Sequence, residues 1–188
     1  MKRHLRIPLF LLISLLNSLA SYASNEMSFH QLGVKTGMSD NYIQAIERDK
    51  YGFMWFATRD GLNRYDGYHF KTYTTLRQGA YNNSVEWVAE DAAGNIWIKT
   101  PVNYCFYDRE MDELDNRTEL LLHKIGIFES PRQLFIDDDK NLWCVADNTL
   151  YYYIFSDETL YKQSLPGSVN IADMACRNKR CYILMKCN

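Results

Sequence analysis

The chain has 188 residues, of which 47% are hydrophobic and 14% aromatic, enough to bury an ordinary core. Its formal net charge is −2, which argues against a nucleic-acid partner because phosphates need a strongly basic protein surface. No pair among its five cysteines has the close spacing of a zinc site, so we expect neither a metal ion nor a cofactor.

Residues 1–23 are typical of a signal peptide. A basic start with Lys2 and Arg3 precedes a mostly apolar run over 7–19, and small residues at Ser21 and Ala23 match what a signal peptidase reads. The apolar run is shorter than the roughly 20 residues that span a bilayer. We therefore expect export to the periplasm with cleavage near Ala23. The alternative is an uncleaved membrane anchor.

Residues 24–38 form a lead-in to the first repeated unit. Phe29-His-Gln-Leu32 is similar to Phe70-Lys-Thr-Tyr73 and stands at nearly the same distance before the unit that follows it. The segment Phe29–Leu32 is therefore predicted to be the outer strand of a closing blade that the chain does not contain.

A tryptophan recurs in one short frame at Trp55, Trp97 and Trp143, and an aspartate stands six residues before each of them. A period of about 40–50 residues made of short strands and turns indicates a β-propeller, in which each blade is a four-stranded sheet. We expect each indole to bridge neighbouring blades and its N–H to find a carbonyl. The structural repeat positions are Asp49, Gly52, Trp55, Thr58, Gly61, Asp91, Gly94, Trp97, Thr100, Asp137 and Trp143.

The predicted fold is all-β, an incomplete β-propeller with about three four-stranded blades and part of a fourth. The blades occupy residues 39–79, 80–128 and 129–166, and a fourth starts in 167–188. Propellers typically have four to eight blades. We therefore expect the missing C-terminal blades to be partners of this chain, and the isolated chain to be unstable or self-associating.

The first unit shows its strands most clearly, with four β-prone segments between Tyr42 and Thr74 joined by tight turns. Gly52 and Gly61 stand where a turn favours a positive φ. In the second unit a weaker fourth strand is predicted near Thr118–Leu122. In the third unit Lys140 replaces the turn glycine, which indicates divergence from the repeat.

Few residues indicate chemistry. Trp87 and Tyr81, on the strand and loop that open the second unit, are candidates for stacking on a sugar ring. For Trp87, packing in the core or between blades is the favoured alternative. No histidine neighbours a nucleophile or a second metal ligand in a recognisable frame, so no catalytic residue is expected. Cys176 and Cys181 flank a short turn and are candidates for a disulfide across a hairpin.

These motifs resemble the two-component regulator propeller repeat. The likeness spans most of residues 27–165 and is carried best by the first unit, through Met38-Ser-Asp-Asn-Tyr-Ile43, Asp49, Gly52, Trp55-Phe-Ala-Thr58 and Gly61-Leu-Asn-Arg-Tyr-Asp66. The usual pattern runs Leu-Ser-x-Asn-x-Val, an aspartate-glycine turn, Trp-Ile-Gly-Thr, and then Gly-Leu with an aromatic-aspartate pair.

The resemblance implies the N-terminal periplasmic sensor of a hybrid two-component histidine kinase. Such sensors typically detect oligosaccharides, control polysaccharide-utilisation genes and act as dimers, so an oligosaccharide ligand and a homodimer of the complete sensor are implied. No kinase, receiver or DNA-binding motif occurs in this chain, so we expect a fragment that is not itself an enzyme. The alternative is a fragment of a secreted propeller hydrolase or lyase acting on glycans, which would need facing carboxylates.

Overall fold

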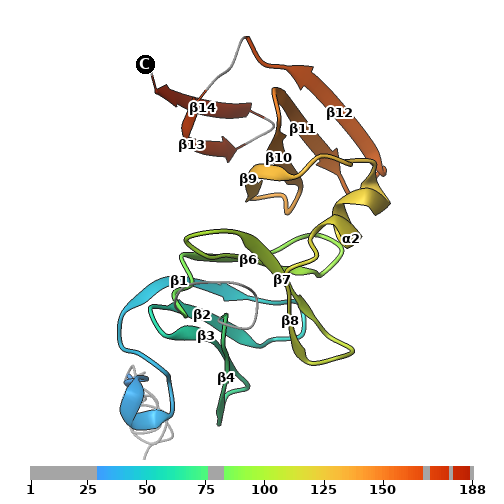
Figure 1. Cartoon of the computed structure of the whole chain (residues 1–188). Helices are drawn as coiled ribbons and strands as arrows, with labels where there is room; N and C mark the ends of the chain where they lie inside the picture. Colours follow the sequence, from blue (N-terminus) through green and yellow to red (C-terminus); the bar gives the residue numbers. More distant parts are fainter. Residues whose placement is uncertain (1–28, 76–82, 167–169, 178–179, 187–188) are drawn as a thin grey trace, which may run out of the picture. The chain divides into compact units, whose positions relative to one another are not determined.

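The computed structural model describes residues 29–75, 83–166, 170–177 and 180–186. The chain divides into two units, Met1–Gln31 and Leu32–Asn188, and all the sheets lie in the second. The described elements are almost all strands, joined in chain order into antiparallel meanders (Figure 1). The predicted all-β class and the four-stranded units are confirmed.

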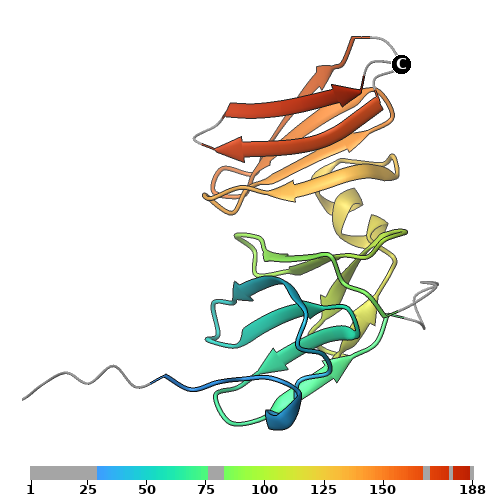
Figure 2. The same ribbon diagram turned by 90° about the vertical axis from the view of Figure 1, so that its left-hand side faces the viewer.

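Three sheets have four strands each, and we call them blades 1, 2 and 3. Blade 1 consists of β1 (Ile43–Arg48), β2 (Met54–Thr58), β3 (Gly61–Tyr65) and β4 (Phe70–Tyr73). Blade 2 consists of β5 (Trp87–Glu90), β6 (Ile96–Lys99), β7 (Tyr104–Asp108) and β8 (Glu113–Asp115). Blade 3 consists of β9 (Pro131–Ile136), β10 (Leu142–Ala146), β11 (Thr149–Ile154) and β12 (Thr159–Ser164). A two-stranded antiparallel hairpin follows, formed by β13 (Asn170–Arg177) and β14 (Arg180–Lys186) (Figure 2).

The fourth strand of blade 2 differs from the prediction. The strand is β8, whereas the predicted strand Thr118–Leu122 is wrong because Glu119–Leu122 forms the short helix α2. Glutamate and leucine are strong helix formers. The carbonyl of Thr118 accepts the N–H of Leu122 at 3.0 Å, and Leu122 is buried. The apolar run that suggested a strand therefore packs as one side of a helical turn, which the 3-10 helix η3 (His123–Ile125) continues.

The described part of the lead-in, residues 29–38, contains no strand. The structure assigns none to residues 29–32, contrary to the prediction, and a strand forms only against a partner, which no described segment provides. The 3-10 helix η1 (Val34–Thr36) comes next. Met38 is then buried, and the backbone N–H of Ser39 donates to Oδ1 of Asn63 at 3.0 Å. The chain directly after the lead-in is therefore hydrogen-bonded to β3 of blade 1.

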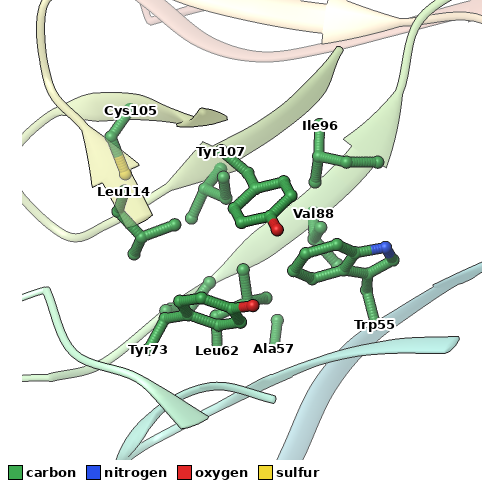
Figure 3. Packing of buried hydrophobic residues seen from close by; sticks show 11 residues of the cluster. Trp55, Ala57, Leu62, Tyr73, Val88, Ile96, Cys105, Tyr107 and Leu114 are labelled. Carbon is green, nitrogen blue, oxygen red and sulfur yellow. The ribbon is translucent and has the colours of Figure 1, made fainter. Parts of the chain in front are cut away.

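Buried side chains gather between consecutive sheets. Between blades 1 and 2, Trp55 is fully buried, its ring centroid 4.8 Å from that of Tyr107, and Tyr107 lies 5.3 Å from Tyr73 (Figure 3). Trp97 has the same place between blades 2 and 3, and Trp143 packs with residues of blade 3 and of the β13–β14 hairpin. Each indole thus lies where one sheet meets the next, which accounts for a large ring in every repeat.

Apolar side chains are exposed on the first strand and on the last hairpin. Ile46 of β1 is 53% exposed, and Leu184 of β14 is 64% exposed. Such surfaces favour association, so self-association of the isolated chain stays a prediction. In the part of the chain that the structure describes, no helix is both long enough and apolar enough to span a bilayer.

Candidate functional site

Each aspartate of the repeat binds the indole six residues later. The Nε1–H groups of the three tryptophans donate to Oδ2 of their aspartates at 3.0 Å (Asp49–Trp55), 2.8 Å (Asp91–Trp97) and 2.8 Å (Asp137–Trp143). The expectation of a carbonyl acceptor is wrong. A carboxylate forms a stronger hydrogen bond with the buried N–H than a neutral carbonyl would, and it links the turn directly to the inter-blade core.

The same aspartates close the turn between the first and second strand of each blade. Oδ1 accepts the backbone N–H four residues later, at 3.0 Å from Phe53, 2.9 Å from Asn95 and 2.9 Å from Asn141. The residue three after each aspartate has a positive φ, 92° and 90° at the two glycines and 61° at Lys140. Glycine adopts this conformation at little steric cost, so Lys140 needs a separate explanation.

The threonines serve the next turn in blades 1 and 2. Oγ1 of Thr58 donates to the carbonyl of Gly61 at 2.8 Å, and Oγ1 of Thr100 donates to the carbonyl of Asn103 at 3.1 Å. Gly61 has φ 108°, and a Cβ there would lie 2.8 Å from the carbonyl oxygen of Tyr73. The contacts of these repeat residues hold the turns and the inter-blade core together.

A groove of about 500 Å³ crosses the first strands of the three blades, and we call it the first-strand groove. It brings together side chains from β1, β5 and β9 and from the turn after β9. Its lining residues are Ala45, Ile46, Glu47, Trp87, Val88, Ala89, Glu90, Phe135, Ile136, Asp137, Asp138 and Lys140.

Glu90 connects all three blades at one side of the groove, with its side chain only 1% exposed. Oε1 accepts the backbone N–H of Lys50 in blade 1 at 2.9 Å, and Oε2 accepts Nζ of Lys140 in blade 3 at 2.5 Å. Nη2 of Arg109 in blade 2 lies 4.0 Å from Oε1. A buried carboxylate requires such partners, because an unpaired charge away from water is strongly destabilising.

Lys140 lies between two carboxylates. Besides Glu90, its Nζ is 3.6 Å from Oε1 of Glu47 on β1. Burial opposes the charge on Lys140, but the bonds to Glu90 and Glu47 outweigh it and raise the pKa of the ammonium. Burial also raises the pKa of the Glu47 carboxyl, against the opposing effect of Lys140. The lysine that interrupts the glycine pattern thus supplies the cation that the groove carboxylates need.

The aromatic candidate Trp87 lies in this groove. It is half-buried on β5, and its ring stacks with that of Phe135 on β9 at a centroid distance of 6.5 Å and an interplanar angle of 23°. It also packs against the core between blades 2 and 3, so both roles considered for it are compatible with its position. The second candidate, Tyr81, lies outside the described residues.

The cysteines fall into two groups. Cys105 and Cys144 are free and buried, and burial raises the pKa of each thiol to about 12. Such thiols are unreactive at neutral pH. The register of β13 and β14 places Cys176 opposite Cys181, as a cross-hairpin disulfide requires, and the disulfide itself stays a prediction. Among the described residues no cluster of histidine, cysteine, aspartate and glutamate could hold a metal ion.

Sequence reasoning missed Glu47, Glu90 and Phe135 as groove residues. One local feature could have pointed to Glu90, because it immediately precedes the repeat aspartate at the end of a strand. The structure buries this position. From the sequence, Lys140 is only a replacement of the turn glycine in the third unit. Its ion pairs join residues 50 and 93 positions apart in the chain, and no local pattern records such a contact.

The family described as two component regulator propeller matches residues 37–60, which include the first aspartate, glycine, tryptophan and threonine of the frame. Residues 37–60 are thus similar to a two-component regulator propeller repeat. The resemblance stated from the sequence is therefore confirmed.

Similar proteins are much longer than the matched parts of this chain. Histidine kinase P4 of Formosa agariphila is 51% identical over 37 residues, which are 20% of this chain and 3% of the kinase. The extracellular domain of a hybrid two component system from B. thetaiotaomicron superposes with a TM-score of 0.43 at 17% identity, over 85% of this chain and 30% of that chain. Virginiamycin B lyase from Staphylococcus aureus superposes with a TM-score of 0.46 at 13% identity, over 78% of this chain and 50% of the lyase chain.

Proposed function

We propose that this propeller segment belongs to the exported, periplasmic sensor part of a hybrid two-component regulator, and that the first-strand groove binds an oligosaccharide. In the complete protein, binding would control genes for polysaccharide utilisation through a dimer that exists in two arrangements. The match of residues 37–60 supports the sensor family, and the groove carries the proposal of a ligand.

The composition of the groove supports a saccharide ligand. Trp87 and Phe135 offer aromatic surface for the apolar face of a sugar ring, while Glu47 and Lys140 offer hydrogen-bond partners for its hydroxyls. Sites for small ligands combine such apolar surfaces with a few placed polar groups. Because three blades contribute, a bound ligand would contact all of them and could favour one arrangement of the blades.

The groove is less suited to glycoside hydrolysis, which was the alternative. That reaction needs two carboxyl groups that flank an open site and reach the scissile bond. Glu90 is buried and occupied by Lys50 and Lys140, so Glu47 lacks an accessible partner in this pair. For the pair Glu47 and Glu90, a binding role therefore agrees better with these contacts than a hydrolase or lyase does.

The test is a titration of the full chain with oligosaccharides from several plant and algal polysaccharides, followed by calorimetry and intrinsic tryptophan fluorescence. We expect Trp87→Ala to weaken binding about fivefold or more, since loss of one aromatic surface for stacking removes roughly 1–3 kcal/mol. Tyr68→Ala is the matched control, because Tyr68 is 85% exposed and does not line the groove. Equal affinity of Trp87→Ala and the unmodified chain would contradict the proposed site.

A further inference from the structure

The first-strand groove is unusually rich in acid. Four carboxylates line it, from Glu47, Glu90, Asp137 and Asp138, whereas Lys140 is its single cationic lining residue among the described residues. If all four acids are ionised, the lining has a formal charge of −3. Charges in a concave, partly dry site are screened less than on an open surface, so this imbalance acts on any ligand that enters.

The cation in the groove is already shared. Nζ of Lys140 is bonded to Glu90 and lies 3.6 Å from Glu47, so two resident carboxylates compete for one ammonium. Arg109 reaches Glu90 at 4.0 Å and Asp49 at 3.3 Å, but it does not line the groove. An incoming carboxylate would therefore have to displace a resident one.

The hydrogen bonds to Asp137 come from neutral groups. Its oxygens accept the indole N–H of Trp143 and backbone N–H groups of its own turn, which are neutral donors. These donors bring no positive charge into the groove. Burial is the first cause of the raised pKa of Glu47, and the charge of Glu90 raises it a little further.

We propose that the first-strand groove selects its saccharide by charge, accepting neutral and amino sugars and rejecting sugars with carboxylate or sulfate groups. This inference rests on the proposed saccharide-binding function and specifies its ligand class. A neutral sugar donates hydroxyl hydrogens to the oxygens of Glu47 and brings no charge. An amino sugar adds the cation that the lining lacks, and an acidic sugar brings like charge to carboxylates.

The test uses the full chain and oligosaccharides of equal length from the glucose, galactose and mannose series, each as the neutral, the 2-amino and the uronic-acid form. We expect the amino form to bind most tightly and the uronic-acid form at least tenfold more weakly than the neutral form. Added salt should narrow both differences, because it screens the charges that cause them.

Charge-removing variants locate the effect. Asp138→Asn and Glu47→Gln should each reduce the discrimination against the uronic-acid form by about tenfold, the order expected for one charge at this range in a partly screened site. Glu113→Gln is the matched control, since Glu113 is exposed on β8 and does not line the groove. Near-ultraviolet circular dichroism of each variant is the check that its tryptophans remain packed.

The outcomes separate the two proposals. Binding that depends on Trp87 and is as tight or tighter for the uronic-acid form would overturn the charge rule and leave the saccharide site standing. Binding of no form, or binding that Trp87→Ala leaves unchanged, would contradict the site itself and the charge rule with it. Glu113→Gln could also lower the discrimination against the uronic-acid form as much as Asp138→Asn does. The origin of the discrimination would then lie outside the groove, and the inference would be overturned.

Discussion

Replacing Asp91 by asparagine tests whether the aspartate of the repeat works as an anchor for the indole. In the native chain Oδ2 accepts Nε1–H of Trp97 and Nδ2–H of Asn95, both at 2.8 Å, while Oδ1 accepts the backbone N–H of Asn95 at 2.9 Å. An asparagine has only one acceptor oxygen. Whichever way its amide is turned, an NH2 group faces at least one of these donors.

The cost follows from these contacts. Each hydrogen bond to a charged acceptor contributes about 1.5–3 kcal/mol, and a buried donor left unpaired costs about 1–3 kcal/mol. Burial raises the pKa of Asp91 despite its bonds, so removing the charge returns part of that cost. We expect Asp91→Asn to lower the free energy of unfolding by about 2–4 kcal/mol in urea titrations followed by tryptophan fluorescence.

Asp108→Asn provides the control. Oδ1 of Asp108 accepts the backbone N–H groups of Glu110 and Met111 in a turn, with no indole involved. An asparagine oxygen can accept both, so we expect a change below about 0.5 kcal/mol. If Asp91→Asn proved as mild as Asp108→Asn, the carboxylate would not be needed to hold the indole.

Three further predictions concern turns and charges. Gly61→Ala should lower the melting temperature more than Gly52→Ala, because both have positive φ but only at Gly61 would the new Cβ meet a carbonyl, at 2.8 Å. Burial opposes ionisation of Asp112, but bonds from an ammonium and two phenols outweigh it and lower its pKa. Its contribution is therefore present above about pH 4 and lost as pH falls, so Asp112→Asn should cost stability at about pH 7 and little at about pH 2 in thermal melts. Lys140→Gly relieves a positive φ but leaves Glu90 buried without its ammonium. We expect the free energy of unfolding to fall by about 2–4 kcal/mol in urea titrations. A rise in the free energy of unfolding would refute the role of this ion pair.

The sequence predicted the blades because their determinants are local. The aspartate, the turn glycine and the tryptophan lie within seven residues, and each strand pairs with its neighbour in the chain. The four strands of blade 1 lie within the predicted span Tyr42–Thr74, and the four strands of blade 3 lie within the predicted range 129–166. The exception in blade 2 is also local, since the run at Glu119–Leu122 is apolar enough for an edge strand but consists of residues that favour a helix.

The groove was beyond sequence reasoning because its contacts are not local. Trp87 was recognised as a candidate by its type, yet its neighbour Phe135 lies 48 positions later in the chain. The partners of Glu90 come from blade 1 and blade 3 and become visible only when the blades are stacked. Without an account of those partners, Lys140 could be read only as a departure from the pattern.

The first-strand position of Trp87 differs from blade to blade, whereas the aspartate and tryptophan of the repeat are the same in all three blades. Counted from the repeat aspartates, the position of Trp87 is held by Ala45 in blade 1 and Gln133 in blade 3, so no two blades present the same side chain there. The aspartates and tryptophans cannot vary in this way, because each pair satisfies its own buried donor and fills the contact between sheets. A propeller can therefore keep its fold through the constant positions while the first-strand positions change the shape and charge of the groove. The proposed saccharide sensing would use this freedom, because Trp87 and Glu47 of the groove lie on first strands whose side chains differ between the blades.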